Sequence, residues 1–240
     1  MGIVYKAEDT RLERTVAIKV LSRHLDSDSA AKKRFIHEAR TASSLDHPND
    51  GYVHEIGETD DGQLFIAMAF YVGETIDVKI GRGPLHIIDA LNNTIQTAEG
   101  LVTAHSKGII HRDIKPANLM VTDEGVVKIL DFGVAKMSSQ TQLTKTGATV
   151  GTTLYMSPEQ ARGDPTDQRV DVWALGVALY EMLAGVRPFN SEYEAAVVYS
   201  ILNEDPEFIT KVRAETPAAL ERVVEKALAK KVDQRYQTVE

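Results

Sequence analysis

The sequence predicts an α+β chain of two lobes, a small β-rich lobe with one helix and a larger, mainly helical lobe. Two observations support this prediction. Apolar and polar residues alternate as in strands through the first third of the chain, whereas apolar residues recur at helical spacing after Tyr71. The chain has 240 residues, 43% of them hydrophobic, which is enough to bury most of its apolar surface. We expect the small lobe at residues 1–70 and the large lobe at residues 71–240.

The small lobe is expected to hold two strand pairs and one helix. Strand-like segments at residues 3–7 and 15–21 flank the turn-like sequence DTRLER and predict a hairpin. Ser27 or Ser29 is suited to cap a helix over residues 31–45, which the sequence HPN ends. Two further strands, near residues 52–58 and 63–70, are joined by the turn residues TDDG.

Three apolar patterns predict helices in the large lobe. The segment around Trp173 is apolar nearly all round, so it should be the buried axis of this lobe. The other two patterns are amphipathic stripes, each of which should turn its apolar face to the core. The first stripe consists of Ile87, Ile88, Leu91, Ile95, Ala98, Leu101 and Val102, and the second of Leu220, Val223, Val224, Ala227 and Leu228.

Composition excludes several classes of function. A formal net charge of −8 argues against a nucleic-acid partner, whose binding surface would show a basic stripe. The chain has no cysteine, which suits the cytoplasm. Its longest apolar stretch, residues 172–186, contains Glu181 and is too short to span a membrane. We expect a cytoplasmic domain without a signal peptide or membrane segment, while an anchor elsewhere in the gene remains open.

Two short motifs point to phosphoryl transfer. The chain reads HRDIKPAN at residues 111–118 and DFG at residues 131–133. Phosphoryl transfer from ATP requires a carboxylate to orient the acceptor hydroxyl, a cation near the migrating phosphate, and oxygen ligands for Mg²⁺. Asp113 is the expected catalytic carboxylate and Lys115 the cation. Asn118 and Asp131 offer the hard oxygen donors that Mg²⁺ prefers.

Four further motifs flank these two, two of them before residue 111 and two after residue 133. They are VAIK at residues 16–19, Glu38 within RFIHEA, SPE at residues 157–159 and DVWALG at residues 171–176. With these motifs the chain resembles a eukaryotic-like serine/threonine protein kinase catalytic domain over nearly its whole length, and its wording is most similar to the bacterial members. The resemblance implies ATP and Mg²⁺ as cofactors and protein Ser/Thr hydroxyls as acceptors. A dimer for autophosphorylation in trans is a further expectation.

The resemblance also assigns an ATP site. It places Lys19 on the α- and β-phosphates, held there by Glu38, although an exposed edge lysine and a surface acid are the ordinary alternatives for these two residues. Adenine would lie between apolar side chains, beside the gatekeeper Met68, and would bond to the backbone of the segment between the lobes. The residues concerned are Gly2, Val4, Ala17, Met120, Ala69 and Tyr71.

Other motif residues are expected to shape the site. By resemblance, His111 packs with Phe132, although a histidine beside a catalytic aspartate also suggests a base. Asp171 would accept hydrogen bonds from the catalytic-loop backbone. Glu159 and Arg235 resemble a buried ion pair that anchors the activation segment.

Hydroxyl-rich residues 138–153 resemble an activation segment. Thr144 and Thr146 match threonines that become phosphorylated, and Arg112 would give such a phosphate a bidentate partner. Thr152 resembles the substrate-loop threonine that bonds near Asp113.

Three departures from the family pattern keep alternatives open. Only Gly2 and Val4 match the glycine-rich loop, so a first strand is expected before residue 1, and a last helix is expected after residue 240. Asp50 and Gly51 replace the apolar start of a strand, which should weaken the small lobe. One alternative function is an ATP-binding pseudokinase or scaffold. Another is a small-molecule phosphotransferase of the aminoglycoside-kinase type, but such enzymes lack SPE and the GTxxY substrate loop.

Overall fold

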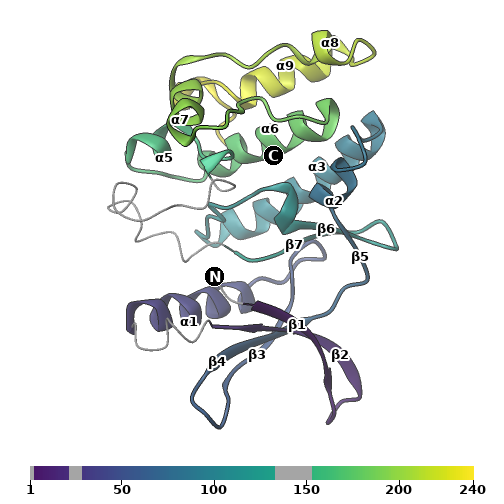
Figure 1. The fold of residues 1–240 in the computed structure, drawn as a ribbon, viewed down its shortest axis with the longest axis vertical. Helices are drawn as coiled ribbons and strands as arrows, with labels where there is room; N and C mark the ends of the chain where they lie inside the picture. The colour runs from purple at the N-terminus through teal and green to yellow at the C-terminus, as the bar shows by residue number, and fades with distance from the viewer. Residues whose placement is uncertain (1–2, 22–28, 133–152) are drawn as a thin grey trace.

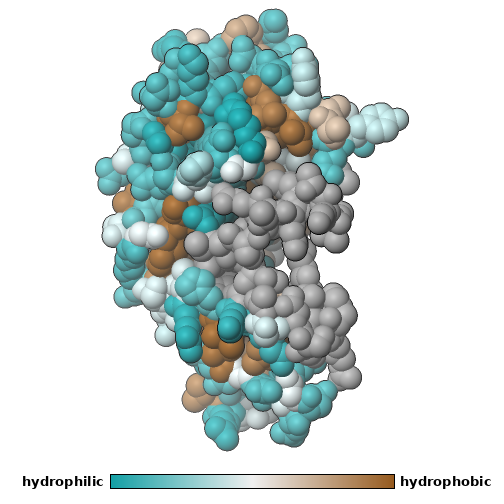
Figure 2. Space-filling view, turned by 90° about the vertical axis from the view of Figure 1, so that its left-hand side faces the viewer, coloured by the Kyte–Doolittle hydropathy of each residue, from teal (hydrophilic) through white to brown (hydrophobic). Residues whose placement is uncertain are grey.

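The computed structural model describes residues 3–21, 29–132 and 153–240. Figure 1 shows a β-sheet region formed by the N-terminal part of the chain and a larger helical region formed by the rest. The predicted α+β class is confirmed. Within the described residues, no helix is long and apolar enough to cross a membrane. Figure 2 shows, on one face, small groups of hydrophobic residues separated by hydrophilic ones.

The N-terminal sheet has four antiparallel strands in the order β1-β2-β4-β3. Their bounds are β1 Ile3–Asp9, β2 Arg14–Val20, β3 Val53–Glu58 and β4 Leu64–Ala69. The β1–β2 turn forms because the Asp9 carboxylate accepts the N–H groups of Arg11 and Leu12 and pairs with Arg14. Helix α1, Ser29–Ser43, buries Phe35 and Ala39 against Leu64 and Ile66 of β4.

A second, three-stranded sheet of order β5-β6-β7 lies at the base of the helical region (Figure 1). It consists of β5 Gly73–Thr75, β6 Leu119–Thr122 and β7 Val127–Ile129. Gly73 has φ +154° and a Cβ there would lie 2.2 Å from the Val121 carbonyl oxygen, so the pairing of β5 with β6 requires glycine. The hairpin of β6 and β7 brings together the motifs that precede β6 and follow β7.

Helix α6, Arg169–Ala184, is the buried axis of the helical region, as predicted. Every residue from Val170 to Leu183 is buried, and Trp173 is fully buried. The other described helices of this region lie around it. They are α2 Ile76–Ile80, α3 Ile87–Ser106, α5 Pro158–Arg162, α7 Glu194–Asn203, α8 Ile209–Val212 and α9 Ala218–Ala227, with short 3₁₀ turns η2 Pro116–Asn118 and η4 Val232–Gln234.

The predicted stripe of α3 is wrong at two positions. Ile88 and Ile95 are 71% and 53% exposed, and Val223 of α9 is also exposed. Apart from Leu101, which was predicted, the residues on the buried face of α3 are small or polar. A Cβ at Gly100 would lie 2.7 Å from Ile129 Cδ1, so α3 approaches β7 too closely for large side chains on this face. The buried residues are Ala90, Asn93, Thr97, Gly100, Leu101 and Ala104.

Asp50 and Gly51 do not begin a strand of the sheet. β3 begins at Val53, while Asp50 forms a parallel bridge with Ile129 of β7. The Gly51 N–H donates to the Ile129 carbonyl at 2.9 Å, and a Cβ at Gly51 would lie 2.9 Å from that oxygen. The departure from the family pattern therefore lies in a segment docked on the helical region and not at the start of β3. The expected weakening of the small lobe stays a prediction.

Candidate active site

The segment between α3 and β6 brings three predicted site residues together. The Lys115 ammonium lies 3.1 Å from Asp113 Oδ2, and both side chains are largely buried. The Asn118 amide nitrogen donates to the Asp113 carbonyl at 2.8 Å and to its Oδ2 at 3.3 Å. Asp113 is thus held by a cation and an amide in a fixed position at the end of the loop.

The buried carboxylate of Asp171 fixes the conformation of this loop. It accepts the N–H of His111 at 2.9 Å and that of Arg112 at 2.8 Å. Arg112 has φ +62°, a left-handed conformation that costs free energy in a non-glycine residue. His105 Nε2 lies 2.8 Å from Asp171 Oδ2. We infer that these contacts offset the strain at Arg112 and orient Asp113.

His111 is engaged by its surroundings on both ring nitrogens. Its Nδ1 accepts the Asp113 N–H at 3.2 Å, so Nε2 carries the proton that is donated to the Leu130 carbonyl at 3.2 Å. Burial lowers the pKa of His111 below its ordinary value, so the ring is neutral. Its centroid lies 4.8 Å from that of Phe132. This geometry supports a packing role and not that of a base.

Lys19 connects the N-terminal sheet to the segment after β7. Its ammonium lies 2.9 Å from Asp131 Oδ1. Asp131 has φ +54° and is partly exposed, whereas the Lys19 side chain is mostly buried. The Leu130 N–H donates to the Asn118 carbonyl at 2.8 Å, so Asp131 lies beside the loop that holds Asp113. The Glu38 side chain, predicted to hold Lys19, lies outside the described residues.

An apolar cavity of about 200 Å³ lies between the sheet and the β6–β7 hairpin. Asp131 and Phe132 lie on its wall. The predicted adenine-site residues Val4, Ala17, Met68, Ala69, Tyr71 and Met120 all line it, and Gly2 lies outside the described residues. Sequence reasoning missed Ala39 and Ala42 of α1, whose small side chains leave room in the cavity. Such an apolar pocket with few polar groups suits a planar base.

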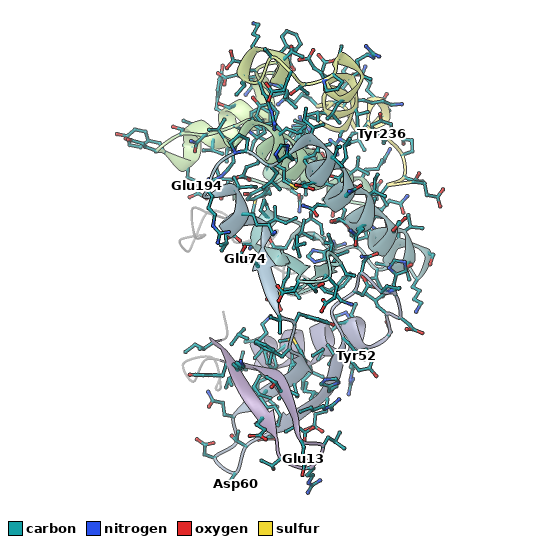
Figure 3. The ribbon with its side chains drawn as sticks, turned by 90° about the vertical axis from the view of Figure 1, so that its right-hand side faces the viewer. Glu13, Tyr52, Asp60, Glu74, Glu194 and Tyr236 are labelled. Atoms are coloured by element: carbon teal, nitrogen blue, oxygen red, sulfur yellow. The ribbon has the colours of Figure 1, made fainter. Side chains whose placement is uncertain are left out.

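Two hydroxyl groups connect the segment before α5 to the helical region. Thr153 Oγ1 donates to Glu194 Oε1 at 2.7 Å, at the start of α7. Figure 3 labels Glu194 on the helical side of the molecule. The Tyr155 hydroxyl donates to Glu181, whose other oxygen accepts from Arg187. Sequence reasoning missed both contacts, because no local pattern relates residues 26 and 41 positions apart.

Glu159 and Arg235 form a buried bidentate ion pair. Arg235 Nη1 lies 2.7 Å from Glu159 Oε1 and Nη2 lies 3.0 Å from Oε2. Arg235 also donates to the Ala229 and Arg169 carbonyls. Burial alone would raise the pKa of Glu159, but the Arg235 guanidinium holds this pKa below its ordinary value. The predicted residues Thr144, Thr146 and Thr152 lie outside the described residues.

The apolar cavity has Asp131, the ion-pair partner of Lys19, on its wall, and it lies next to an aspartate held by lysine and asparagine. This arrangement is the one used in phosphoryl transfer. All 240 residues of the chain match the family described as protein kinase domain, and the chain belongs to this family. The resemblance seen in the sequence is therefore confirmed.

Curated bacterial proteins are similar to the chain over nearly its whole length. It is 42% identical to serine/threonine-protein kinase PknB of Mycolicibacterium smegmatis over 99% of the chain and 39% of that protein. It is 39% identical to serine/threonine-protein kinase PrkC of Bacillus subtilis over 100% of the chain and 37% of that protein. The chain thus spans about two fifths of the length of these relatives.

Proposed function

We propose that this domain transfers the γ-phosphoryl group of ATP to serine and threonine hydroxyls of proteins. The observation that carries this proposal is that two lysine–aspartate ion pairs lie on segments that are hydrogen-bonded to each other. Lys115 and Asp113 lie on one segment, and Lys19 of β2 pairs with Asp131 on the segment after β7. The Leu130–Asn118 hydrogen bond ties these two segments together. The names of the relatives support serine and threonine as acceptors.

Each of these side chains has a proposed part in the transfer. Asp113 accepts the proton of the acceptor hydroxyl and orients its oxygen, and Lys115 offsets charge on the migrating group. Lys19 binds the α- and β-phosphates, with Glu38 holding it in place. Because the Asn118 amide nitrogen faces Asp113, its oxygen is available as a ligand together with the Asp131 carboxylate. These two hard oxygen donors fit Mg²⁺, which supplies charge neutralisation on the phosphates when bound.

The apolar cavity is the proposed binding site of adenine. Val4 and Ala17 from the sheet and Met120 from β6 lie on its walls, with Met68 as gatekeeper. The backbone from Ala69 to Tyr71 supplies hydrogen bonds to the base, and Gly2 lies over the phosphates. In this proposal residues 1–70 form the small lobe and residues 71–240 the large lobe. The cavity then lies where the lobes meet.

In this proposal protein substrates bind near Thr152. In the sequence this residue precedes Thr153 and Tyr155, whose hydroxyl groups donate to Glu194 and Glu181. We further propose that the domain acts in the cytoplasm and forms a dimer when one copy phosphorylates another. The alternative function is that of an ATP-binding pseudokinase. Transfer of labelled phosphate from ATP to protein distinguishes the two, since a pseudokinase binds the nucleotide without transfer.

Asp131→Asn is expected to raise the Mg²⁺ concentration that supports half-maximal activity by at least about tenfold. The substitution keeps an oxygen donor but removes the negative charge that attracts the ion, and tenfold corresponds to only ~1.4 kcal/mol. Phosphate transfer to a basic protein is measured over a Mg²⁺ titration, with complete loss expected in chelator. The exposed residue Asp123 provides the matched control, Asp123→Asn. An unchanged Mg²⁺ requirement in Asp131→Asn would remove Asp131 from the proposed metal site.

Incubation with Mg-ATP is expected to add phosphate at Thr144 or Thr146. Each phosphate brings about −1.5 to −2 charges, which Arg112 can pair with. Arg112 Nε is buried and has no hydrogen-bond partner among the described residues, which supports pairing with an added phosphate. Peptide mass spectrometry locates the phosphates, and the variant with both threonines changed to alanine should lose most activity. Phosphate found only at Ser138 or Ser139, or full activity of that variant, would contradict regulation at these threonines.

A further inference from the structure

Asp50 is a buried acid without a hydrogen-bond partner. The residue is 5% exposed, and neither carboxyl oxygen has a partner among the described residues. Buried polar groups nearly always have such a partner, because leaving water without one costs free energy. An acid in this position therefore calls for an explanation.

The segment that carries Asp50 is fixed on the helical region by its neighbours. The Ile129 N–H donates to the Asn49 carbonyl at 2.7 Å, and the Gly51 N–H donates back to the Ile129 carbonyl. The Asn49 side chain donates to the Val127 carbonyl at 2.9 Å. A Cβ at Gly100 of α3 would lie 3.1 Å from Asp50 Oδ1. The Asp50 carboxyl group is thus packed between β7 and α3.

The same segment leads directly into β3 of the N-terminal sheet. The Tyr52 N–H donates to the Tyr71 hydroxyl at 2.9 Å, and the Ala69 N–H donates to the Tyr52 carbonyl. Figure 3 shows Tyr52 at the level where the sheet region meets the helical region. Tyr71 lines the cavity assigned to adenine. Asp50 therefore lies two residues from Tyr52, whose hydrogen bonds to Tyr71 and Ala69 lie beside the cavity assigned to adenine.

The cations near Asp50 are engaged elsewhere. Lys128 of β7 donates to the Pro48 carbonyl and lies 4.9 Å from the centre of the Tyr71 ring. Lys107, after α3, donates to the Ser44 carbonyl. The Tyr71 phenol also faces Asp50. On the same segment, the Asp50 N–H donates to the His47 carbonyl, and the His47 ring accepts from the Asn49 N–H.

Burial dominates the protonation of this carboxyl. It raises the pKa of Asp50 to about 7, and the attraction of Lys128 and Lys107 offsets only part of that effect. Below neutral pH the group therefore holds its proton in the folded protein, whereas in the unfolded chain it loses it near pH ~3.9.

We propose that Asp50 makes the packing of residues 47–52 on the helical region dependent on pH. Its carboxyl group is neutral while this segment packs on β7 and α3, and its ionisation weakens that packing. This inference does not depend on the proposed transfer reaction. An acid that holds its proton more tightly when folded stabilises the folded state less as pH rises. The loss begins above the ordinary pKa of aspartate, continues to about pH 7 and levels off at higher pH.

The test compares urea unfolding of the wild type and Asp50→Asn from pH 5 to pH 8.5. Asparagine has nearly the same shape but does not titrate, so all other titrations cancel in the comparison. Between pH 5 and pH 8 the unfolding constant of the wild type should rise by roughly 100-fold relative to that of Asp50→Asn. The matched control is Asp60→Asn, at the exposed tip between β3 and β4 (Figure 3), for which the ratio should stay within about twofold.

Two further measurements keep the proposal open to contradiction if Asp50→Asn folds poorly. Asp50→Leu should remove the same pH dependence, because it too has no proton to lose. In the wild type, the infrared carbonyl band of a protonated carboxyl should disappear as pH rises through 7. A ratio that changes less than about threefold, or a wild type without that band at pH 6, would overturn the proposal.

Discussion

Asp113→Asn is expected to abolish phosphate transfer to protein while leaving the protein folded. The amide keeps the shape of the carboxylate and its place beside Lys115 and Asn118, but it cannot accept the proton of the acceptor hydroxyl. Groups of this kind contribute about 10²–10⁴ in rate. The initial rate of labelled phosphate transfer measures the loss, with Asp123→Asn as the matched control and circular dichroism to show that the variant is folded.

Lys19→Met tests the other charged pair in the same assay. The side chain keeps its length and packing but loses the ammonium that lies 2.9 Å from Asp131. Retention of more than about a tenth of the wild-type rate by either variant corresponds to a loss below ~1.4 kcal/mol and would contradict the role proposed for that residue.

Arg235→Met is expected to lower the free energy of unfolding by about 3–5 kcal/mol, because it leaves the buried carboxylate of Glu159 without its partner. Urea unfolding measures the change. The double variant Glu159→Met/Arg235→Met should recover part of the loss, since the unpaired charge is gone. Arg162, which pairs with Asp164 at the surface, provides the control Arg162→Met, with an expected change below about 1 kcal/mol.

This ion pair also gives the stability a dependence on pH. The pKa of Glu159 is lower in the folded protein than in the unfolded chain, so its contribution is present above the ordinary pKa of glutamate. The contribution is lost as pH falls below the ordinary pKa of glutamate and through the lower pKa that Glu159 has in the folded protein. In Arg235→Met this acid-side loss should shrink. Equal unfolding curves for Arg235→Met and the wild type at neutral pH would show that the pair contributes little.

The sequence predicted most of the fold because single elements carry strong local patterns. The four strands of the first sheet lie within about two residues of their expected bounds, and α6 is buried on all sides as its composition indicated. The pattern failed where contact distance, and not hydrophobicity, decides which face is buried. On α3 the close approach to Ile129 selects Gly100 on the buried face, whereas Ile88 and Ile95 are exposed.

The motifs predicted which residues the site brings together but not what holds them. Asp113, Lys115 and Asn118 are neighbours in the sequence, so their meeting requires only a tight loop. The support that His105 gives to Asp171 joins residues 66 positions apart, and no pattern in the sequence indicates it. The environment of Asp50 also depends on tertiary packing, although the unusual pair Asp50-Gly51 marked the position.

The docking of residues 49–51 on β7 has a consequence for α1. Ser44, just after α1, is held by Lys107 next to the end of α3, so this end of the helix is fixed to the helical region. Any rotation of the sheet would then swing α1 about its C-terminal end. At 1.5 Å per residue, Glu38 lies only ~8 Å from Ser43, whereas Ser29 lies ~21 Å away. A swing that carries the first turn of α1 by a given distance thus moves the Glu38 backbone by about a third of it. Glu38, the residue proposed to hold Lys19, is therefore displaced much less than the start of the helix.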